Sequence, residues 1–172
     1  IIDMIVMKEN WYVLFVLVAK EKKLCSVLTK KGLNAFIPQM EYYRRDIKGN
    51  ALKSLFPGYI FIKSEMNQSD FDNFLYKLED QRDGLIRQLK KDGISALRKE
   101  EIEMFKKLLN NEGILEMSQA FIEDKKAVVT KGPLIYYQDH IVKVDKHNKL
   151  ACLDLKFMNR QILVGLNIKS KI

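Results

Sequence analysis

The residues best suited to bind a ligand are the cations gathered near the end of the chain. Residues 125–172 hold 10 Lys and Arg against 3 Asp and Glu, a net charge of +7, whereas residues 1–124 hold 20 against 19, a net charge of +1. Such cations bind the phosphate oxygens of nucleic acids, and Arg also stacks on unpaired bases. The alternatives are a generic basic surface and docking on an acidic protein partner such as a ribosomal protein. The candidate residues are Lys131, Lys143, Lys146, His147, Lys149, Lys156 and Arg160.

A second group of cations stands beside aromatic residues in the first half of the chain. Tyr42 and Tyr43 are followed directly by Arg44 and Arg45, and Lys48 comes three residues later. Aromatic and cationic side chains combined next to a hairpin tip are typical of nucleic-acid contacts. The alternative interpretation is a solvated hairpin that binds nothing.

The sequence offers no pattern for catalysis or metal binding. Cys25 and Cys152 lie 127 positions apart without a CxxC spacing, and the two histidines, His140 and His147, lack the partners of a triad or a zinc site. We therefore expect a protein that is not an enzyme and uses no cofactor and no metal. The longest apolar run, Trp11–Ala19, is shorter than the about 20 residues of a membrane span, so we expect a cytoplasmic protein without membrane contact.

The first half of the chain alternates between strand and helix patterns. Trp11–Val18 is a continuous β-branched and aromatic run, typical of a strand buried on both faces at the centre of a sheet. Glu21–Lys31 repeats apolar residues at helical spacing, and Gly32 follows as a residue that tolerates a left-handed backbone. Asn34–Arg45 returns to strand character. Residues 46–50 contain the Gly and Asn expected in a hairpin loop.

A turn and two further helices follow. Pro57 fixes φ and Gly58 is free to take a positive φ, as a type II turn requires, and the strand Tyr59–Ile62 comes next. Ser69 stands where an N-cap would open a helix with apolar residues between 71 and 78. The other expected elements are a strand at Gly84–Leu89 and a helix at Arg98–Asn110. The alternation predicts an α/β sandwich over residues 8–111.

The pattern of apolar and polar residues changes beyond residue 111. Residues 112–124 lack clear periodicity and are expected to form a linker. Four short strand patterns then recur at roughly 10-residue spacing, which suggests a small antiparallel β-barrel over residues 125–172. These patterns are Ala127–Thr130, His140–Val144, Leu150–Leu155 and Ile162–Leu166. The predicted fold class is therefore α+β, an α/β sandwich followed by a five-stranded barrel.

The two halves together resemble the NusG family of transcription factors, in which a domain called NGN is joined to a barrel called KOW. The resemblance rests on four motifs in the family's order and at the family's spacing. They are Trp11-Tyr12-Val13, Phe56-Pro57-Gly58-Tyr59-Ile60-Phe61, Lys131-Gly132-Pro133-Leu134 and Val142-Lys143-Val144-Asp145. The short chain and the basic barrel look closer to the specialised antitermination branch, RfaH and especially LoaP, than to housekeeping NusG. One departure is His140, where the KOW motif normally carries a glycine.

The resemblance implies a bacterial factor that binds elongating RNA polymerase as a monomer. Its first domain would meet the clamp helices of the β′ subunit through an aromatic surface, and a second contact would reach the β gate loop. Aromatic anchors suit such an interface, although alternate residues of a strand also serve as core. We expect Phe56 and Tyr59 at the interface and Phe61 in the core. The full set of expected polymerase-binding residues is Trp11, Tyr12, Phe56, Pro57, Gly58, Tyr59, Asn67 and Ser69.

For the remaining cations, the resemblance implies two nucleic-acid contacts. The hairpin that carries Arg44, Arg45 and Lys48 lies near upstream DNA in the family, and the barrel of the LoaP branch meets an RNA hairpin in the nascent leader. The leading hypothesis is a transcription antitermination factor. Its competitors are a ribosome-associated KOW-type structural RNA-binding protein and a housekeeping NusG-type factor for elongation or termination. Ribosomal proteins are usually basic throughout, whereas residues 1–124 are nearly neutral.

Overall fold

The computed structural model describes residues 9–93, 97–155 and 160–170, and the chain folds into two compact units. The first unit comprises residues 1–37 and 57–102, and the second comprises residues 38–56 and 103–172. The second unit is thus built from two separate stretches of sequence. The expected sandwich of residues 8–111 differs from this division, because residues 38–56 group with the C-terminal residues.

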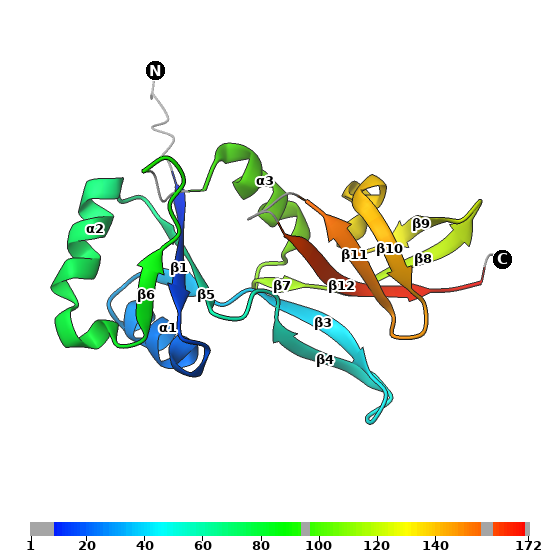
Figure 1. Cartoon of the computed structure of the whole chain (residues 1–172), viewed down its shortest axis with the longest axis horizontal. Coiled ribbons are helices and arrows are strands. Elements are labelled where there is room, and N and C mark those ends of the chain that lie inside the picture. Colours follow the sequence, from blue (N-terminus) through cyan, green and yellow to red (C-terminus); the bar gives the residue numbers. More distant parts are fainter. Residues whose placement is uncertain (1–8, 94–96, 156–159, 171–172) are drawn as a thin grey trace, which may run out of the picture. The chain divides into compact units, whose positions relative to one another are not determined.

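A four-stranded sheet with the order β2-β5-β1-β6 forms the centre of the first unit. The strand β1 lies between β5 and β6 and pairs antiparallel with both (Figure 1). Trp11, Tyr12, Val13 and Leu14 are all buried, so the expected central strand is confirmed. The strands are β1 (Asn10–Val16), β2 (Asn34–Phe36), β5 (Tyr59–Ser64) and β6 (Leu85–Gln88).

Two helices cover one face of this sheet. They are α1 (Glu21–Lys30) and α2 (Gln68–Lys77), close to the two helices expected from the sequence. Alternate residues of β1 pack against both helices in one apolar core. Removal of this apolar surface from water stabilises the fold. Gly32 follows α1 with a φ of 96°, as a left-handed C-terminal residue should. The core residues are Tyr12, Leu14, Val16, Leu24, Leu28, Ile60, Ile62, Phe71, Leu75 and Leu78.

The opposite face of the sheet is aromatic. The Trp11 ring lies edge-on to Phe36 and Phe61, with ring centroids 6.0 and 6.5 Å apart. The Lys63 ammonium stands 4.7 Å from the centroid of the Trp11 ring, on the strand opposite it. Both faces of the sheet are therefore apolar, which explains why β1 reads as a continuous apolar run.

The turn before β5 is held by the start of α1. Gly58 has a φ of 87°, which confirms the positive φ expected of this turn. Its N–H donates to Oε2 of the buried Glu21 at 2.9 Å, and its carbonyl accepts from the N–H of Val16 at 2.7 Å. A Cβ at Gly58 would lie 3.0 Å from the carbonyl oxygen of Val16, so glycine is required here by both φ and space.

A proline divides the strand expected at Asn34–Arg45. Residues before Pro38 form β2, and residues after it form β3 (Gln39–Arg44) in a different sheet. Proline cannot donate to a strand ladder, so the chain changes sheets at this position. The three-stranded sheet has the order β4-β3-β7, with β4 at Gly49–Ser54 and β7 at Ile114–Leu115. The expected hairpin loop is the turn between β3 and β4.

The C-terminal residues form a five-stranded sheet with the order β10-β11-β12-β8-β9. All neighbours pair antiparallel except β12 and β8, which pair in parallel. All four strands expected beyond residue 125 are present. Their bounds are β9 (Lys126–Lys131), β10 (Ile141–Asp145), β11 (Leu150–Asp154) and β12 (Gln161–Ile168).

The fifth strand lies in the segment expected to be a linker. Residues 112–124 contain β7 and also β8 (Ser118–Glu123), so this segment is largely strand. The inward residues of β8 are the small Ser118 and Ala120. A strand is recognised by the alternation of large apolar and polar residues, and because β8 lacks large inward residues its sequence resembles that of a loop. Ser118 is fully buried, and its hydroxyl accepts from the N–H of Leu134 at 3.0 Å.

His140 ends a short 3-10 turn just before β10. It is exposed, and its ring lies edge-on to Tyr137 with centroids 5.7 Å apart. Its φ is not positive, so the backbone at this position does not require a glycine. The β10 strand follows directly, and the histidine is accommodated without loss of the strand.

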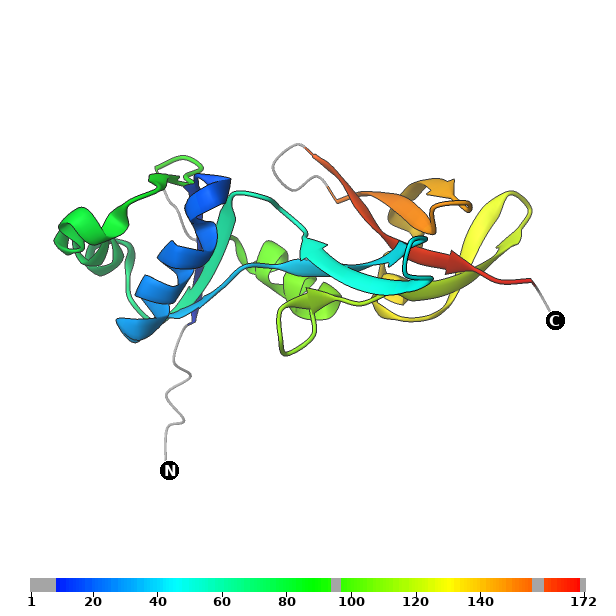
Figure 2. The ribbon, with the colours of Figure 1, turned by 90° about the horizontal axis from the view of Figure 1, so that it is seen from below.

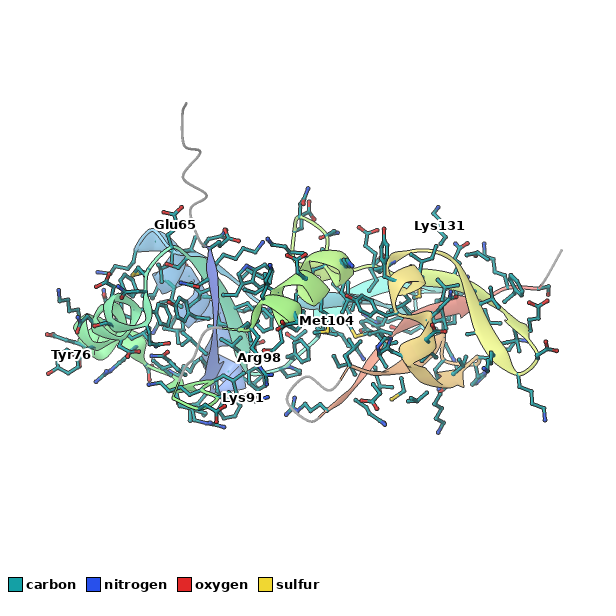
Figure 3. The ribbon with its side chains drawn as sticks, turned by 90° about the horizontal axis from the view of Figure 1, so that it is seen from above. Glu65, Tyr76, Lys91, Arg98, Met104 and Lys131 are labelled. Carbon is teal, nitrogen blue, oxygen red and sulfur yellow. The ribbon has the colours of Figure 1, made fainter. Side chains whose placement is uncertain are left out.

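A substitution at Phe56 tests the packing of the second unit. Its ring is 2% exposed and lies edge-on to Phe105 of α3 (Lys99–Leu108), with centroids 6.0 Å apart. Phe56→Ala should lower the free energy of unfolding by about 3–5 kcal/mol, because it removes a buried ring and leaves a cavity. Tyr76, which is 74% exposed and projects from α2 (Figure 3), provides the control. Tyr76→Ala should change stability by less than about 0.5 kcal/mol in the same urea titration.

Candidate functional site

One face of β3 packs against the C-terminal sheet within the second unit. Glu41 and Tyr43 share a face of the strand, because successive side chains of a strand point to opposite sides, and Arg45 follows in the turn after β3. Each of the three contacts a residue from the C-terminal stretch. Figure 2 shows the β3–β4 hairpin lying along this part of the unit.

The three contacts are specific. The Oε1 atom of Glu41 accepts a hydrogen bond from the N–H of Met117 at 2.8 Å. The ammonium of Lys149 stands 3.9 Å from the centroid of the Tyr43 ring, within the range of a cation–π contact. The Nη2 atom of Arg45 donates to Oδ1 of Asn148 at 2.9 Å, joining positions 103 residues apart.

A glycine lets the two backbones approach. Gly165 of β12 is buried, and a Cβ built on it would lie 2.7 Å from the carbonyl oxygen of Glu41 and 2.8 Å from Sδ of Met117. Both distances are shorter than real Cβ contacts, so any side chain at this position would push β3 away. The docking of the hairpin therefore depends on glycine for space.

These contacts join two basic turns into one surface. We call it the basic junction, and it consists of Arg45 and Lys48 from the β3–β4 turn with Lys146, His147 and Lys149 from the β10–β11 turn. Apart from Lys149, whose ammonium covers Tyr43, these residues are exposed. No carboxylate in the described residues lies within ion-pair distance of any of them.

The two acids of these turns are occupied by their own turns. Asp46 pairs with Arg44, whose guanidinium lowers the pKa of that carboxyl. Asp145 accepts from the N–H of Asn148 at 3.0 Å and from its side-chain amide at 2.7 Å, and these bonds lower the pKa of Asp145. Both carboxylates are thus engaged within their own turns, and the cations of the junction give it a net positive charge.

The other predicted cations lie elsewhere on the C-terminal sheet. Lys131 ends β9 and projects from the sheet (Figure 3), Lys143 is exposed on β10, and Arg160 is exposed just before β12. Lys156 lies outside the described residues. The structure therefore brings together Arg45, Lys48, Lys146, His147 and Lys149. Arg44 faces the other side of the hairpin and is engaged with Asp46.

The predicted polymerase-binding aromatics are buried. Trp11 and Tyr12 are 1% exposed, Phe56 is 2% exposed and Tyr59 is 7% exposed. Phe56 and Tyr59 are expected at the partner interface, whereas in the structure both rings are buried, because both sides of the strands around the turn are covered. Gly58 is buried as well, and Pro57 is exposed. A partner contact through these residues stays a prediction.

An exposed apolar patch lies beside the same turn, and the sequence did not indicate it. Leu17 and Val18 are 52% and 58% exposed, because β1 ends at Val16 and the chain turns into a short 3-10 helix. A Cβ at Gly58 would lie 3.5 Å from the Phe15 ring and 3.6 Å from Cγ2 of Val18. Phe15 and Val18 therefore lie next to Gly58, and together with their exposed sequence neighbours Leu17 and Pro57 they make up what we call the apolar patch.

Asn67 and Ser69 lie at the start of α2. Asn67 is the N-cap, since its side chain accepts from the N–H of Asp70 at 2.8 Å, so the expected cap at Ser69 is corrected to Asn67. Ser69 is exposed in the first turn. Next to them, Oδ1 of Asp72 accepts from Gln88 at 2.6 Å and from Gln68 at 2.8 Å. Both bonds, the first above all, lower the pKa of Asp72.

The described residues offer no metal site and no membrane-spanning helix. No group of three or more His, Cys, Asp or Glu in that part of the chain could hold a metal ion. No helix in the described ranges is long and apolar enough to cross a membrane. Cys25 and Cys152 are half-buried free thiols, and burial raises the pKa of the Cys25 thiol.

Comparison with known proteins gives one family and one fold. The family model described as NusG, transcription termination factor nusG, matches residues 9–106, which is more than half of the chain. None of the curated proteins matches the chain. Among solved structures, the chain is similar to the one described as "Domain interaction in Thermotoga maritima NusG". The identity is 17%, the TM-score is 0.50, and 94% of each chain is covered.

The Asp72 network predicts a pH dependence of stability. Because the folded state lowers the pKa of Asp72 below its ordinary 3.8, this carboxylate stabilises the fold above that pH. The stabilisation is lost as the pH falls through the folded pKa. Asp72→Asn should therefore lower the urea midpoint near neutral pH, and the deficit should shrink in acid.

The measurement is a series of urea titrations from about pH 7 to about pH 2. Asp80→Asn, at an exposed position after α2, is the matched control and should show no such pH-dependent difference. A deficit for Asp72→Asn that stays constant across the series would contradict the assignment.

Proposed function

The chain belongs to the NusG family of transcription factors, and from this premise we propose that it is an antitermination factor of the LoaP and RfaH type. Its NGN-like domain, residues 8–111, binds elongating RNA polymerase. Its KOW-like C-terminal residues, 125–172, bind RNA of the nascent leader. The observation that carries the RNA assignment is the net charge of +7 on those 48 residues, set against +1 on the rest of the chain.

The apolar patch supports the polymerase contact. An exposed set of Leu17, Val18 and Pro57 is costly to leave in water and marks a protein interface. The buried Tyr59 supports this surface from within, since its ring centroid lies 5.2 Å from that of Phe15. We propose that the patch meets the β′ clamp helices, and that the exposed Ser69, next to the capping Asn67, meets the β gate loop.

Contact with both elements would favour the elongating state of the polymerase. A factor shifts such an equilibrium only through a difference in affinity for the two states. A factor that bridges the mobile clamp to a second element has that difference, because it binds both at once only when the clamp is closed. Leader RNA then recruits the factor to its own transcripts.

Two other functions are alternatives to this proposal. A housekeeping NusG-type factor would act on transcripts without regard to their leader. A ribosome-associated KOW-type protein would bind ribosomal RNA or ribosomal protein. The nearly neutral charge of residues 1–124 favours a polymerase-facing module over a ribosomal one, because ribosomal proteins are usually basic throughout.

In vitro transcription tests the proposal. Addition of the full chain to polymerase from the same source should raise readthrough of an intrinsic terminator when the native leader lies upstream. A template with a scrambled leader should show little change. Equal readthrough on both templates would favour the housekeeping function, and no effect on either template together with co-purification of ribosomes would favour the ribosomal one.

The apolar patch provides a test of the polymerase contact that leaves the core intact. Leu17→Ser combined with Val18→Ser should weaken polymerase binding at least about tenfold, because exposed apolar anchors carry much of an interface's energy. The melting temperature should stay within a few degrees of the parent chain, since both side chains are more than half exposed.

Tyr76→Ser is the matched control, because Tyr76 is the most exposed large apolar side chain described on α2. It should leave polymerase binding unchanged. Equal binding by the double variant and the control would remove the apolar patch from the interface.

A further inference from the structure

We infer that the β3–β4 hairpin is part of the RNA-binding surface, so that Arg45 and Lys48 bind the same single-stranded RNA as Lys146, His147 and Lys149. The inference rests on the RNA contact of the proposed function and extends it to a segment outside the C-terminal residues. The family resemblance implied different nucleic acids for these two groups, upstream DNA for the hairpin and RNA for the barrel.

The geometry of the hairpin is the first support. Glu41 and Tyr43 of β3 and Arg45 in the turn that follows are fixed to the C-terminal stretch by two hydrogen bonds and one cation–π contact. Gly165 brings the backbones close enough for all three contacts. The hydrogen bond from Arg45 to Asn148 therefore holds the start of the β3–β4 turn next to the β10–β11 turn.

Charge is the second support. Residues 44–48 and 143–149 together hold six Lys and Arg against two Asp. Both carboxylates are engaged inside their own turns, by Arg44 and by Asn148. The exposed Arg45, Lys48 and Lys146 have no ion-pair partner among the described residues, so an external polyanion is the ligand that would neutralise them.

The choice of single-stranded RNA over duplex DNA follows from the rings beside the cations. The exposed His147 lies in the β10–β11 turn, and the half-buried Tyr43 ring lies against Lys149 of the same turn. Single-stranded RNA is bound by cations together with aromatic or imidazole rings that stack on its unpaired bases, whereas the bases of a duplex are already stacked.

Neutral substitutions in the full chain test the inference. The probe is a fluorescein-labelled single-stranded RNA, and binding is measured by anisotropy over a series of salt concentrations. Arg45→Gln, Lys48→Gln and Lys146→Gln should each weaken binding several-fold and reduce the log–log salt slope by about 0.7, the value for one phosphate contact on a single strand. Lys126→Gln, an equal charge change at an exposed position of β9, is the matched control and should leave the slope unchanged.

Gly165→Ala separates geometry from charge. It removes no cation, yet the added Cβ would lie 2.7 Å from the Glu41 carbonyl and displace the hairpin. RNA affinity should fall, and combining Gly165→Ala with Arg45→Gln should cost less than the two separate losses added together. If Gly165→Ala does not fold, the three neutral variants still decide the question.

The outcomes distinguish this inference from the proposed function. If Lys146→Gln lowers the slope while Arg45→Gln and Lys48→Gln do not, the hairpin is outside the RNA surface and the RNA contact of the C-terminal residues stands. If the parent chain fails to bind RNA, both are overturned. Tighter binding to a duplex DNA of equal length, lost through the same substitutions, would overturn the assignment to RNA.

Discussion

The close approach of two backbones at Gly165 is the constraint on which the second unit depends. A side chain there would meet the Glu41 carbonyl at 2.7 Å, so β3 can lie on β12 only because this position has none. Once the strands are this close, Glu41 reaches the N–H of Met117 and Tyr43 reaches Lys149. Each contact is individually modest, since an exposed cation–π contact contributes about 0.5–1 kcal/mol. All of them depend on the close approach of the strands at Gly165, so a side chain at that position would weaken them together.

Local signals were sufficient to predict much of the fold. Gly32, the Pro57–Gly58 turn and the four strands beyond residue 125 were expected where they occur, because each rests on residues adjacent in sequence. The strand β8 was missed because its inward residues are the small Ser118 and Ala120. The division at Pro38 and the grouping of residues 38–56 with the C-terminal stretch were also missed. Pro38 was a local signal for the division, because proline is disfavoured within a strand, whereas the grouping depends on which sheet a strand joins, and strand patterns do not carry that information.

The candidate sites show the same limit. Residue types indicated aromatic and basic surfaces, but exposure depends on what covers each face. Phe56 and Tyr59 suited an interface by type and proved buried, whereas Leu17 and Val18 suited a central strand and proved exposed because β1 ends at Val16, two residues before the expected end. The basic residues were identified individually. Their combination into one junction rests on Arg45 and Asn148, which lie 103 positions apart.

Electrostatic screening explains why two adjacent basic turns present a stronger positive potential than two separate ones. At physiological ionic strength the field of an exposed charge falls off over about 8 Å, so cations reinforce one another only when they lie within roughly that distance. The β3–β4 turn and the β10–β11 turn each hold three cations and one Asp in residues 44–48 and 143–149. Since a 2.9 Å hydrogen bond joins Arg45 to Asn148, the two turns lie within one screening length at that point. A phosphate chain passing the junction therefore meets the summed potential of both turns, which neither turn would present if the hairpin were undocked.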